Sequence, residues 1–172
     1  AAVAQLDEAV QEAGVRLGVS LSGPRQAQTP ERVVELRVDG CRLFDTVQAT
    51  WNLLEPSAGP ALAAARRAGM GVIVKEALAN GRLAGREDTP GLAPLFEVAE
   101  ESGSTPDAVA IAAVLAQPWA DVVLSGAATE AQLASNLAAA GLSLGADQVA
   151  RLGALAEEPA AYWAARSALA WN

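Results

Sequence analysis

Histidine is absent from this sequence of 172 residues, which also has one cysteine, one lysine and one tyrosine. Without histidine, these residues can form neither a serine–histidine–aspartate triad nor a histidine metal site, and one cysteine cannot build a zinc cluster. The single Cys41 also excludes an intramolecular disulfide and is typical of a reducing compartment, so we expect a cytoplasmic protein. The groups that most often carry catalysis must therefore be missing or come from elsewhere.

Clustered positive charge and long apolar runs are also scarce. The formal net charge is -8, and the only adjacent basic pair is Arg66-Arg67. Because binding to a phosphate backbone needs patches of lysine and arginine, we expect no nucleic-acid partner. No apolar run reaches the roughly 18–20 residues that cross a bilayer, so we expect no membrane partner either.

Alternating strands and helices are the positive feature of the chain. Short apolar, β-branched runs predict strands near residues 15–20, 45–50, 71–74 and 120–124. Amphipathic patterns and capping residues predict helices over 3–14, from Thr29 to 38, from Ser57 to 69, over 90–102, from Thr105 to 117, from Thr129 to 141, and over 144–157 after Ser143. Such alternation with short connections is typical of a parallel sheet of βα units, here in one domain spanning 1–172.

Two architectures fit four parallel strands: a small open doubly wound sheet, or half of a (βα)8 barrel, which typically takes about 250 residues. The sequence starts inside a predicted helix without a preceding strand, which favours the C-terminal portion of a larger barrel. Half a barrel exposes both sheet edges. We therefore expect self-association, or pairing with a missing N-terminal half.

Polar residues lie at or near the ends of all four predicted strands: Ser20, Gln48, Lys75 and Ser125. The carboxyl ends of parallel strands lie at one edge, where ligands bind, so these side chains are candidates for one site. Solvent-facing residues that merely end each strand remain an alternative. For Lys75 and the adjacent Glu76, a salt bridge at the strand end is the corresponding alternative.

The segment Ser125-Gly126-Ala127-Ala128-Thr129 connects the fourth predicted strand to a helix. Thr129 and Gln132 have the spacing of a capping box. A glycine before a helix amino end suits a phosphate, although an ordinary βα loop has the same pattern. Trp51, after the second strand, could line a pocket or pack under the next loop.

Four segments together resemble the carboxyl-terminal half of the aldo/keto reductases. They are Gly18-Val19-Ser20, the run from Val47 to Leu54, the run from Gly71 to Leu78 with Gly81-Arg82-Leu83, and Gly126-x-x-Thr129-x-x-Gln132-x-x-x-Asn136. The resemblance implies a (βα)8 barrel with two extra helices, near 90–102 and 144–157. It also implies hydride transfer from NADPH to an aldehyde, ketone or sugar carbonyl.

The resemblance assigns a cofactor role to fourteen residues and a substrate role to Trp51. Ser20 and Gln48 would bind the nicotinamide carboxamide, the loop from Lys75 would line nicotinamide and pyrophosphate, and the last segment would hold the adenosine phosphate end. The cofactor residues are Ser20, Gln48, Lys75, Glu76, Ala77, Leu78, Gly81, Arg82, Ser125, Gly126, Ala127, Thr129, Gln132 and Asn136.

Departures from the family pattern set limits on these expectations. Lys75 stands where an aromatic residue usually stacks on the nicotinamide, and it could instead pair with a phosphate or a carboxylate. Ala128 stands where a basic residue often lies, which leaves NAD open beside NADP. The family's catalytic tyrosine, lysine, aspartate and histidine belong to the amino-terminal half, so we expect no catalytic residue in this chain and no activity from it alone. A non-catalytic, reductase-like interaction or regulatory subunit is the alternative.

Overall fold

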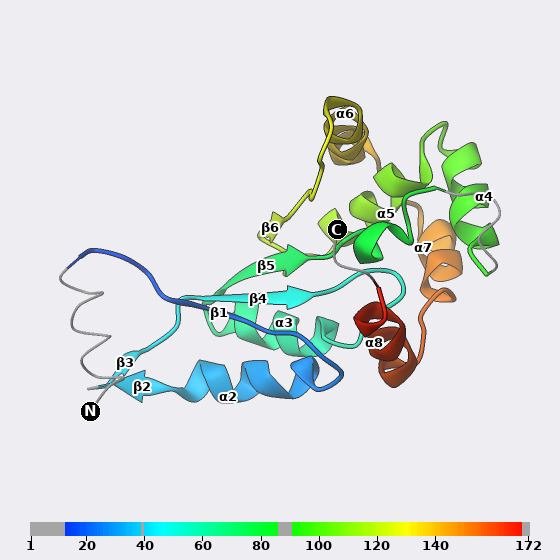
Figure 1. Ribbon diagram of the computed structural model, residues 1–172. Coiled ribbons are helices and arrows are strands. Elements are labelled where there is room, and N and C mark those ends of the chain that lie inside the picture. Colours follow the sequence, from blue (N-terminus) through cyan, green and yellow to red (C-terminus); the bar gives the residue numbers. More distant parts are fainter. Residues whose placement is uncertain (1–12, 39, 86–90, 170–172) are drawn as a thin grey trace.

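The computed structural model describes residues 13–38, 40–85 and 91–169 (Figure 1). Its main sheet contains β1 (Gly18–Ser20), β4 (Thr46–Thr50), β5 (Gly71–Lys75) and β6 (Val122–Val123). The strands lie in the order β1-β4-β5-β6, and all neighbouring pairs are parallel. Spatial order follows chain order without the reversal that marks a doubly wound sheet, so the sheet has the topology of half a (βα)8 barrel.

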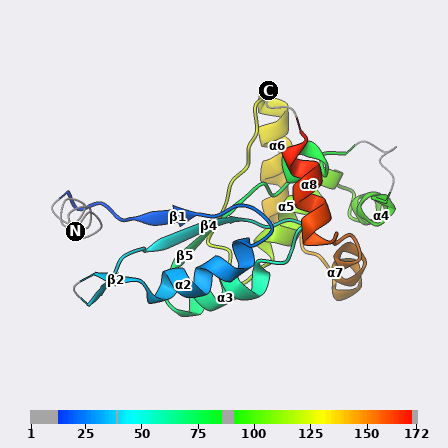
Figure 2. The same cartoon turned by 60° about the horizontal axis from the view of Figure 1, so that its bottom comes forward.

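Seven α-helices and three short 3-10 helices connect or follow these strands in the described residues. The α-helices are α2 (Thr29–Glu35), α3 (Gly59–Arg67), α4 (Ala93–Glu101), α5 (Pro106–Leu115), α6 (Glu130–Ala138), α7 (Ala146–Gly153) and α8 (Pro159–Ser167). The 3-10 helices are η1 (Gln26–Gln28), η2 (Ala79–Gly81) and η3 (Ala139–Gly141). Figures 1 and 2 show α2 and α3 side by side along one face of the sheet. Most of the later helices lie beyond the carboxyl ends of its strands.

Strand register divides the sheet into a helix-covered face and an open face. Val47, Val72 and Val74 are fully buried in a core cluster that includes Leu62 of α3. Gln48 pairs with Ser20 on one side and Ile73 on the other, and these residues alternate with the buried ones. Because side chains along a strand alternate between faces, Ser20, Gln48 and Lys75 share the open face, which would be the interior of a closed barrel.

A second core cluster lies beyond the carboxyl ends of the strands. It brings together Leu83, Leu95 of α4, Leu152 of α7 and Tyr162 of α8, all at most 1% exposed. Helix α5 lies between the two clusters, so its whole run from Ala108 to Val114 is buried: Ile111 and Val114 belong to the sheet cluster, and Val109 belongs to the second. This cluster therefore anchors α7 and α8 against the loops that follow β4 and β5.

The four strands and most helices match the sequence-based predictions, with four corrections. Helix α8 lies in the tail, where no element was expected. The helix predicted from Thr29 to 38 ends at Glu35, and Arg37–Val38 instead forms β2 of a short antiparallel hairpin with β3 (Cys41–Arg42). Thr29 is not an N-cap, since α2 begins at Thr29 itself. Helix α7 begins at Ala146 behind an N-cap at Gly145, so Ser143 does not open it. The predicted helix over 3–14 lies almost wholly outside the described residues.

None of the helices in the described part of the chain combines the length and apolarity that a membrane span requires.

Candidate functional site

Three of the four predicted strand-end residues are in direct contact. Gln48 Nε2 donates a hydrogen bond to Ser20 Oγ at 3.0 Å, and Lys75 Nζ donates to the same oxygen at 3.1 Å. Lys75 Nζ also donates to Ser22 Oγ at 2.8 Å. The register explains the meeting, since β1, β4 and β5 end next to one another with these side chains on the open face. The expectation that these strand ends converge is confirmed.

Lys75 carries a positive charge into a partly buried position. Burial lowers the pKa of Lys75 below its ordinary value; the Glu76 charge acts in the opposite direction, and the Arg166 charge adds to the lowering. Within the described residues no carboxylate lies within ion-pair distance of the Lys75 ammonium. The Lys75–Glu76 salt bridge considered for this strand end is thus not formed.

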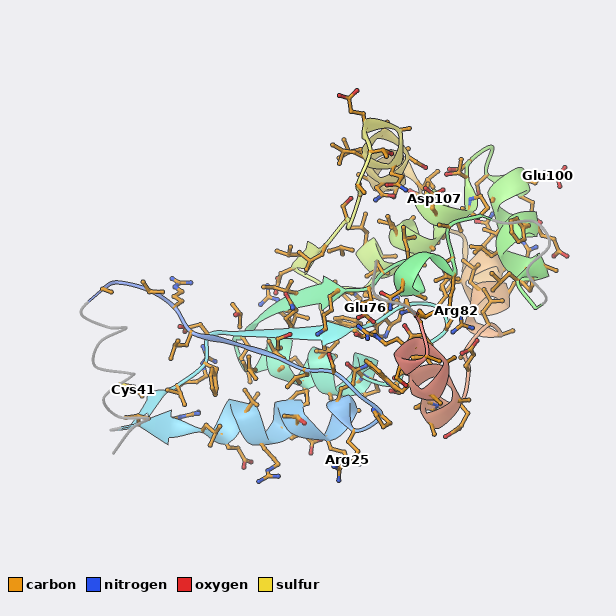
Figure 3. All side chains as sticks on the ribbon, viewed as in Figure 1. Arg25, Cys41, Glu76, Arg82, Glu100 and Asp107 are labelled. Carbon is orange, nitrogen blue, oxygen red and sulfur yellow. The ribbon has the colours of Figure 1, made fainter. Side chains whose placement is uncertain are left out.

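Glu76 turns away from Lys75 toward the C-terminal helix. Its carboxylate accepts a hydrogen bond from Arg166 Nη2 at 2.6 Å and one from Thr50 Oγ1 at 3.3 Å. Its backbone lies in the left-handed region with φ 56°, which is uncommon for a residue other than glycine. In Figure 3 Glu76 lies between the end of the sheet and α8. Glu76 therefore fixes the turn that follows β5.

Arg82 also pairs away from the strand ends. Its guanidinium donates two hydrogen bonds to the Glu157 carboxylate, one of them at 3.1 Å, and lies 5.7 Å from the centre of the Tyr162 ring. These contacts join the loop after β5 to the segment before α8. Because Arg82 does not line the pocket described next, its assignment to the cofactor rests on the resemblance alone.

A pocket of about 470 Å³ opens beside Lys75, between the loop after β5 and the loop after β6. Its lining includes ten of the fourteen residues assigned to the cofactor: Lys75, Glu76, Ala77, Leu78, Gly81, Ser125, Gly126, Ala127, Gln132 and Asn136. Thr129 borders a shallower hollow that shares Ser125 and Gly126. The fourth strand end is thereby brought into the same site as Lys75.

The loop after β6 is held by its own side chains. Thr129 Oγ1 accepts from the Gln132 backbone N–H at 3.2 Å, and Gln132 Oε1 accepts from the backbone N–H groups of Ala128 and Thr129, so the predicted capping box is present. Asn136 Nδ2 donates to Ser125 O at 3.0 Å and to Ser125 Oγ at 2.7 Å. Its Oδ1 is buried and has no hydrogen-bond partner within the described residues. Asn136 thus holds the loop from the inside of the turn, and it also contributes to the pocket lining.

Trp51 lies under the loop that follows it. The indole is 8% exposed, donates from Nε1 to Pro56 O at 3.1 Å and contacts Trp119 edge to face. This is the packing alternative considered from the sequence, and Trp51 does not line the Lys75 pocket. It contributes instead to a separate apolar pocket of about 240 Å³ beside α5 and α7.

Asn52 is a structural residue that the sequence did not single out. It is fully buried, and Nδ2 donates to Glu76 O and to Tyr162 Oη, both at 3.0 Å. Its Oδ1 accepts from the backbone N–H groups of Leu54 and Glu55. Burial raises the pKa of the Tyr162 hydroxyl, and the Asn52 hydrogen bond opposes that rise. Tyr162 is 1% exposed, so it is a buried anchor for α8.

Sequence reasoning also missed Ser22 and the pocket residues Asn80 and Asp107. Burial raises the pKa of Asp107, but hydrogen bonds from Ser135, Thr105 and two backbone N–H groups outweigh burial and hold it below the ordinary value. The Ser20-x-Ser22 spacing was a usable signal, whereas Asp107 reaches the pocket only through the packing of α5. Among the described residues no group of three potential metal ligands occurs.

The fold and the site together define an α/β protein of the (βα)8-barrel type with a polar pocket at the strand ends. The model of the aldo/keto reductase family matches residues 1–157. The chain therefore belongs to the aldo/keto reductase family.

Solved structures agree with this assignment. The thermostable aldo-keto reductase Tm1743, solved with the inhibitor epalrestat, is 20% identical with a TM-score of 0.69 over 89% of this chain. The holo form of the aldo-keto reductase AKR11C1 from Bacillus halodurans is 19% identical with a TM-score of 0.65 over 90%. A structure provisionally assigned as a 2,5-diketo-D-gluconic acid reductase B is 27% identical with a TM-score of 0.67 over 90%.

This chain covers 53%, 55% and 52% of those three proteins, so it spans about half their length. No curated protein sequence matches this chain.

Proposed function

We propose that this chain supplies the cofactor-binding part of an NAD(P)H-dependent aldo/keto reductase, acting in a reducing compartment such as the cytoplasm. The whole enzyme would reduce an aldehyde, ketone or sugar carbonyl by hydride transfer. One observation carries the proposal: in a chain of this family, Ser20, Gln48 and Lys75 meet at the strand ends beside the pocket that contains Ser125 and Asn136.

The pocket has features that fit a nicotinamide dinucleotide. Its lining combines the hydroxyl of Ser125 with the amide side chains of Gln132 and Asn136. A Cβ added at Gly126 would meet no atom within 4 Å, so this loop leaves room beside its backbone. Ser20 and Gln48 would hold the nicotinamide carboxamide, and the loops from Lys75 and from Ser125 would hold the remainder. The bound cofactor would supply the hydride, while these residues would orient it.

Among the described residues we find no tyrosine or histidine placed to donate a proton to the carbonyl oxygen of a substrate. The Tyr162 hydroxyl is buried and hydrogen-bonded to Asn52, and no histidine exists in the sequence. We place the catalytic tyrosine, lysine, aspartate and histidine in an N-terminal half outside this chain, which would be the C-terminal portion of the barrel. The chain alone should therefore be inactive in NADPH-dependent carbonyl reduction, and measurable turnover by the purified 172-residue protein would contradict this.

A non-catalytic, reductase-like subunit is the second candidate. The observation that favours it concerns Lys75. This lysine stands at the position where the family usually has an aromatic residue that stacks on the nicotinamide, and its ammonium contacts Ser20 instead. Such a subunit would bind a partner through its sheet edges. If the longer reading frame carried no tyrosine, lysine and histidine upstream, this candidate would replace the first.

Cofactor binding is tested by titrating NADPH and NADH against tryptophan fluorescence. The variant Gly126→Asp places a carboxylate beside the proposed phosphate position and should weaken binding at least about tenfold, because like charges brought together cost several kcal/mol. Gly126→Asn is the matched control, since asparagine tolerates the observed φ of 64° without adding charge. Quenching that is equal in both variants, or absent at millimolar cofactor, would count against the proposal. The ratio of the affinity for NADPH to the affinity for NADH, measured on the unmodified chain, decides between NADP and NAD.

A further inference from the structure

We propose that Asp107 makes the pocket select a dinucleotide whose adenosine ribose carries free hydroxyls, as in NAD, over one with a 2′-phosphate, as in NADP. This inference rests on the proposed function, because it specifies which form of the cofactor the site receives. Asp107 is the second residue of α5 and lines the pocket of about 470 Å³ together with Ser125 and Asn136. It therefore lies at the part of the pocket that we assign to the adenosine end.

The other two charged side chains of the described pocket lining are engaged elsewhere. Lys75 belongs to the strand-end cluster, which consists of Ser20, Gln48 and Lys75, and its ammonium contacts the end of β1. The Glu76 carboxylate accepts from Thr50 of β4 and pairs with α8. Because β1 and β4 lie on the opposite side of β5 from β6, both charges are held away from the loop that follows β6.

Asp107 is held beside α6, the helix that follows this loop. Its carboxylate accepts hydrogen bonds from the side chains of Ser135 and Thr105 and from two backbone N–H groups at the start of α5. Ser135 Oγ and Thr105 Oγ1 are 2.9 Å apart, and Ser135 directly precedes the pocket residue Asn136. Figure 3 shows Asp107 where the start of α5 lies against α6. These contacts fix the carboxylate on the α6 side of the pocket.

The Asp107 carboxylate is negatively charged and has no cationic partner in the described part of the chain. Burial raises its pKa, but the hydrogen bonds outweigh burial and hold the pKa below its ordinary value. None of the ion pairs formed within residues 13–38, 40–85 and 91–169 includes Asp107. The loop from Ser125 to Thr129 contains no basic residue either. The described lining on this side is therefore negative.

Ribose hydroxyls and a 2′-phosphate respond to such a carboxylate in opposite ways. A hydroxyl donates a hydrogen bond to it, and a bond to a charged acceptor is stronger than one between neutral groups. A phosphate monoester carries a charge of about −1.5 to −2 at neutral pH, so the carboxylate repels it. In doubly wound dinucleotide-binding folds, an acidic residue at the ribose accompanies NAD, and a nearby arginine accommodates the phosphate of NADP. Asp107 supplies the acidic residue.

The two dissociation constants, for NADPH and for NADH, test this assignment, because the two cofactors differ only in the 2′-phosphate. Both are measured by quenching of tryptophan fluorescence at low ionic strength. We expect the unmodified chain to bind NADH at least about tenfold more tightly than NADPH. Asp107→Asn removes the charge but keeps one side-chain oxygen for the hydrogen bonds from Thr105 and Ser135. It should reduce the difference to about threefold or less, mainly through tighter binding of NADPH.

The matched control is Asp147→Asn, since Asp147 is the second residue of α7 and does not line the pocket. It should leave the ratio of the two dissociation constants within about twofold of that of the unmodified chain. Raising the salt concentration to about 0.5 M should narrow the ratio in the unmodified chain and change it little in Asp107→Asn, because salt screens the charge. If Asp107 only stabilised the start of α5, its removal would not change this salt dependence.

The outcomes distinguish this inference from the proposed function. Equal or tighter binding of NADPH by the unmodified chain, or a ratio that Asp107→Asn leaves unchanged, overturns the inference while cofactor binding stands. If neither cofactor quenches the fluorescence at millimolar concentration, the proposed function fails and the inference fails with it. Asp107→Ser also removes the charge and keeps a short acceptor, so it should give the same reduced ratio and replaces Asp107→Asn if that variant does not fold.

Discussion

Glu76 connects the strand-end cluster to the C-terminal helix. Its carboxylate is held by Arg166 of α8, and its carbonyl oxygen by the side chain of Asn52. Three residues in this short segment, Glu76, Ala79 and Asn80, have positive φ values between 49° and 56°. Left-handed backbone at residues other than glycine costs energy and persists only where surrounding contacts impose it. The strained turn lies beside the proposed binding pocket.

The charge of Glu76 should set the titration of Lys75. Burial lowers the Lys75 pKa most; against it the Glu76 charge raises the pKa, and the Arg166 charge lowers it further. In Glu76→Gln the favourable charge disappears and Arg166 loses its carboxylate partner, so the Lys75 pKa should fall further below its ordinary value. The ¹³C shift of lysine Cε against pH measures this directly. An unchanged or higher pKa in Glu76→Gln would show that the electrostatic account of Lys75 is wrong.

Asn52 should be the most costly polar residue to remove. Asn52→Leu removes four side-chain hydrogen bonds and leaves the buried Leu54 N–H and Tyr162 hydroxyl without a partner among the described residues, while the Glu55 N–H keeps its bond to the backbone carbonyl of residue 52 and the Glu76 carbonyl keeps its bond from the Ala79 N–H. We expect a loss of about 3 kcal/mol or more in the free energy of unfolding, measured by urea denaturation.

Tyr162→Phe is the control for Asn52→Leu. It removes only the bond from Asn52 Nδ2, which keeps its bond to Glu76 O, so we expect a loss of about 1 kcal/mol. Equal effects of the two substitutions would contradict the role given to the Asn52 network.

At the level of single elements, strands and capped helices were the predictable part. Short apolar, β-branched runs predicted β4 and β5 to within a residue or two, because these runs supply the side chains that the sheet buries. The Thr129–Gln132 box was predictable because capping is local. Helix α8 was not: apart from Tyr162 and Trp163 it is mostly alanine, and its position depends on the distant partners Asn52 and Glu76.

In the candidate site, too, some contacts could be predicted from the sequence and others depend on tertiary packing. That Ser20, Gln48 and Lys75 meet could be inferred, because parallel strands end at one edge. The bond from Lys75 to Ser22 and the pairing of Arg82 with Glu157 could not, because both depend on loop conformations set by tertiary packing.

The capping box of α6 gives a prediction for one element. Thr129→Ala removes the acceptor for the Gln132 backbone N–H and should lower the free energy of unfolding by about 1 kcal/mol. It should also speed hydrogen exchange in the first turn of α6. Thr129→Ser keeps the hydroxyl and is the matched control. If the alanine and serine variants exchange at the same rate, the cap does not stabilise this helix.

For the molecule as a whole, the open edges and open face of the sheet are the main feature. The described sheet has β1 at one edge and β6 at the other. Val122 and Leu124 at β6 and Leu133 and Leu137 on the following helix α6 are 43–65% exposed. Exposed strand edges with adjacent apolar side chains favour association. In a complete barrel, further strands would cover both edges.

We therefore expect the 17.5 kDa chain to self-associate, with a mass that rises with concentration in light scattering. Leu137→Glu, at the most exposed of these side chains, should shift the distribution toward monomer. Val149→Glu on α7 introduces the same charge away from β6 and should have no such effect. A monodisperse monomer for the unmodified chain would remove the argument from open edges.

The central claim is that the strand-end edge of this half barrel binds a nicotinamide dinucleotide, and hydrogen exchange with and without NADPH tests it most directly. The account predicts slower exchange in the backbone after β1, in residues 75–84 and in residues 125–132, with α7 unaffected. No protection in these segments at saturating NADPH, or protection confined to α7 and the apolar pocket beside it, would contradict the account.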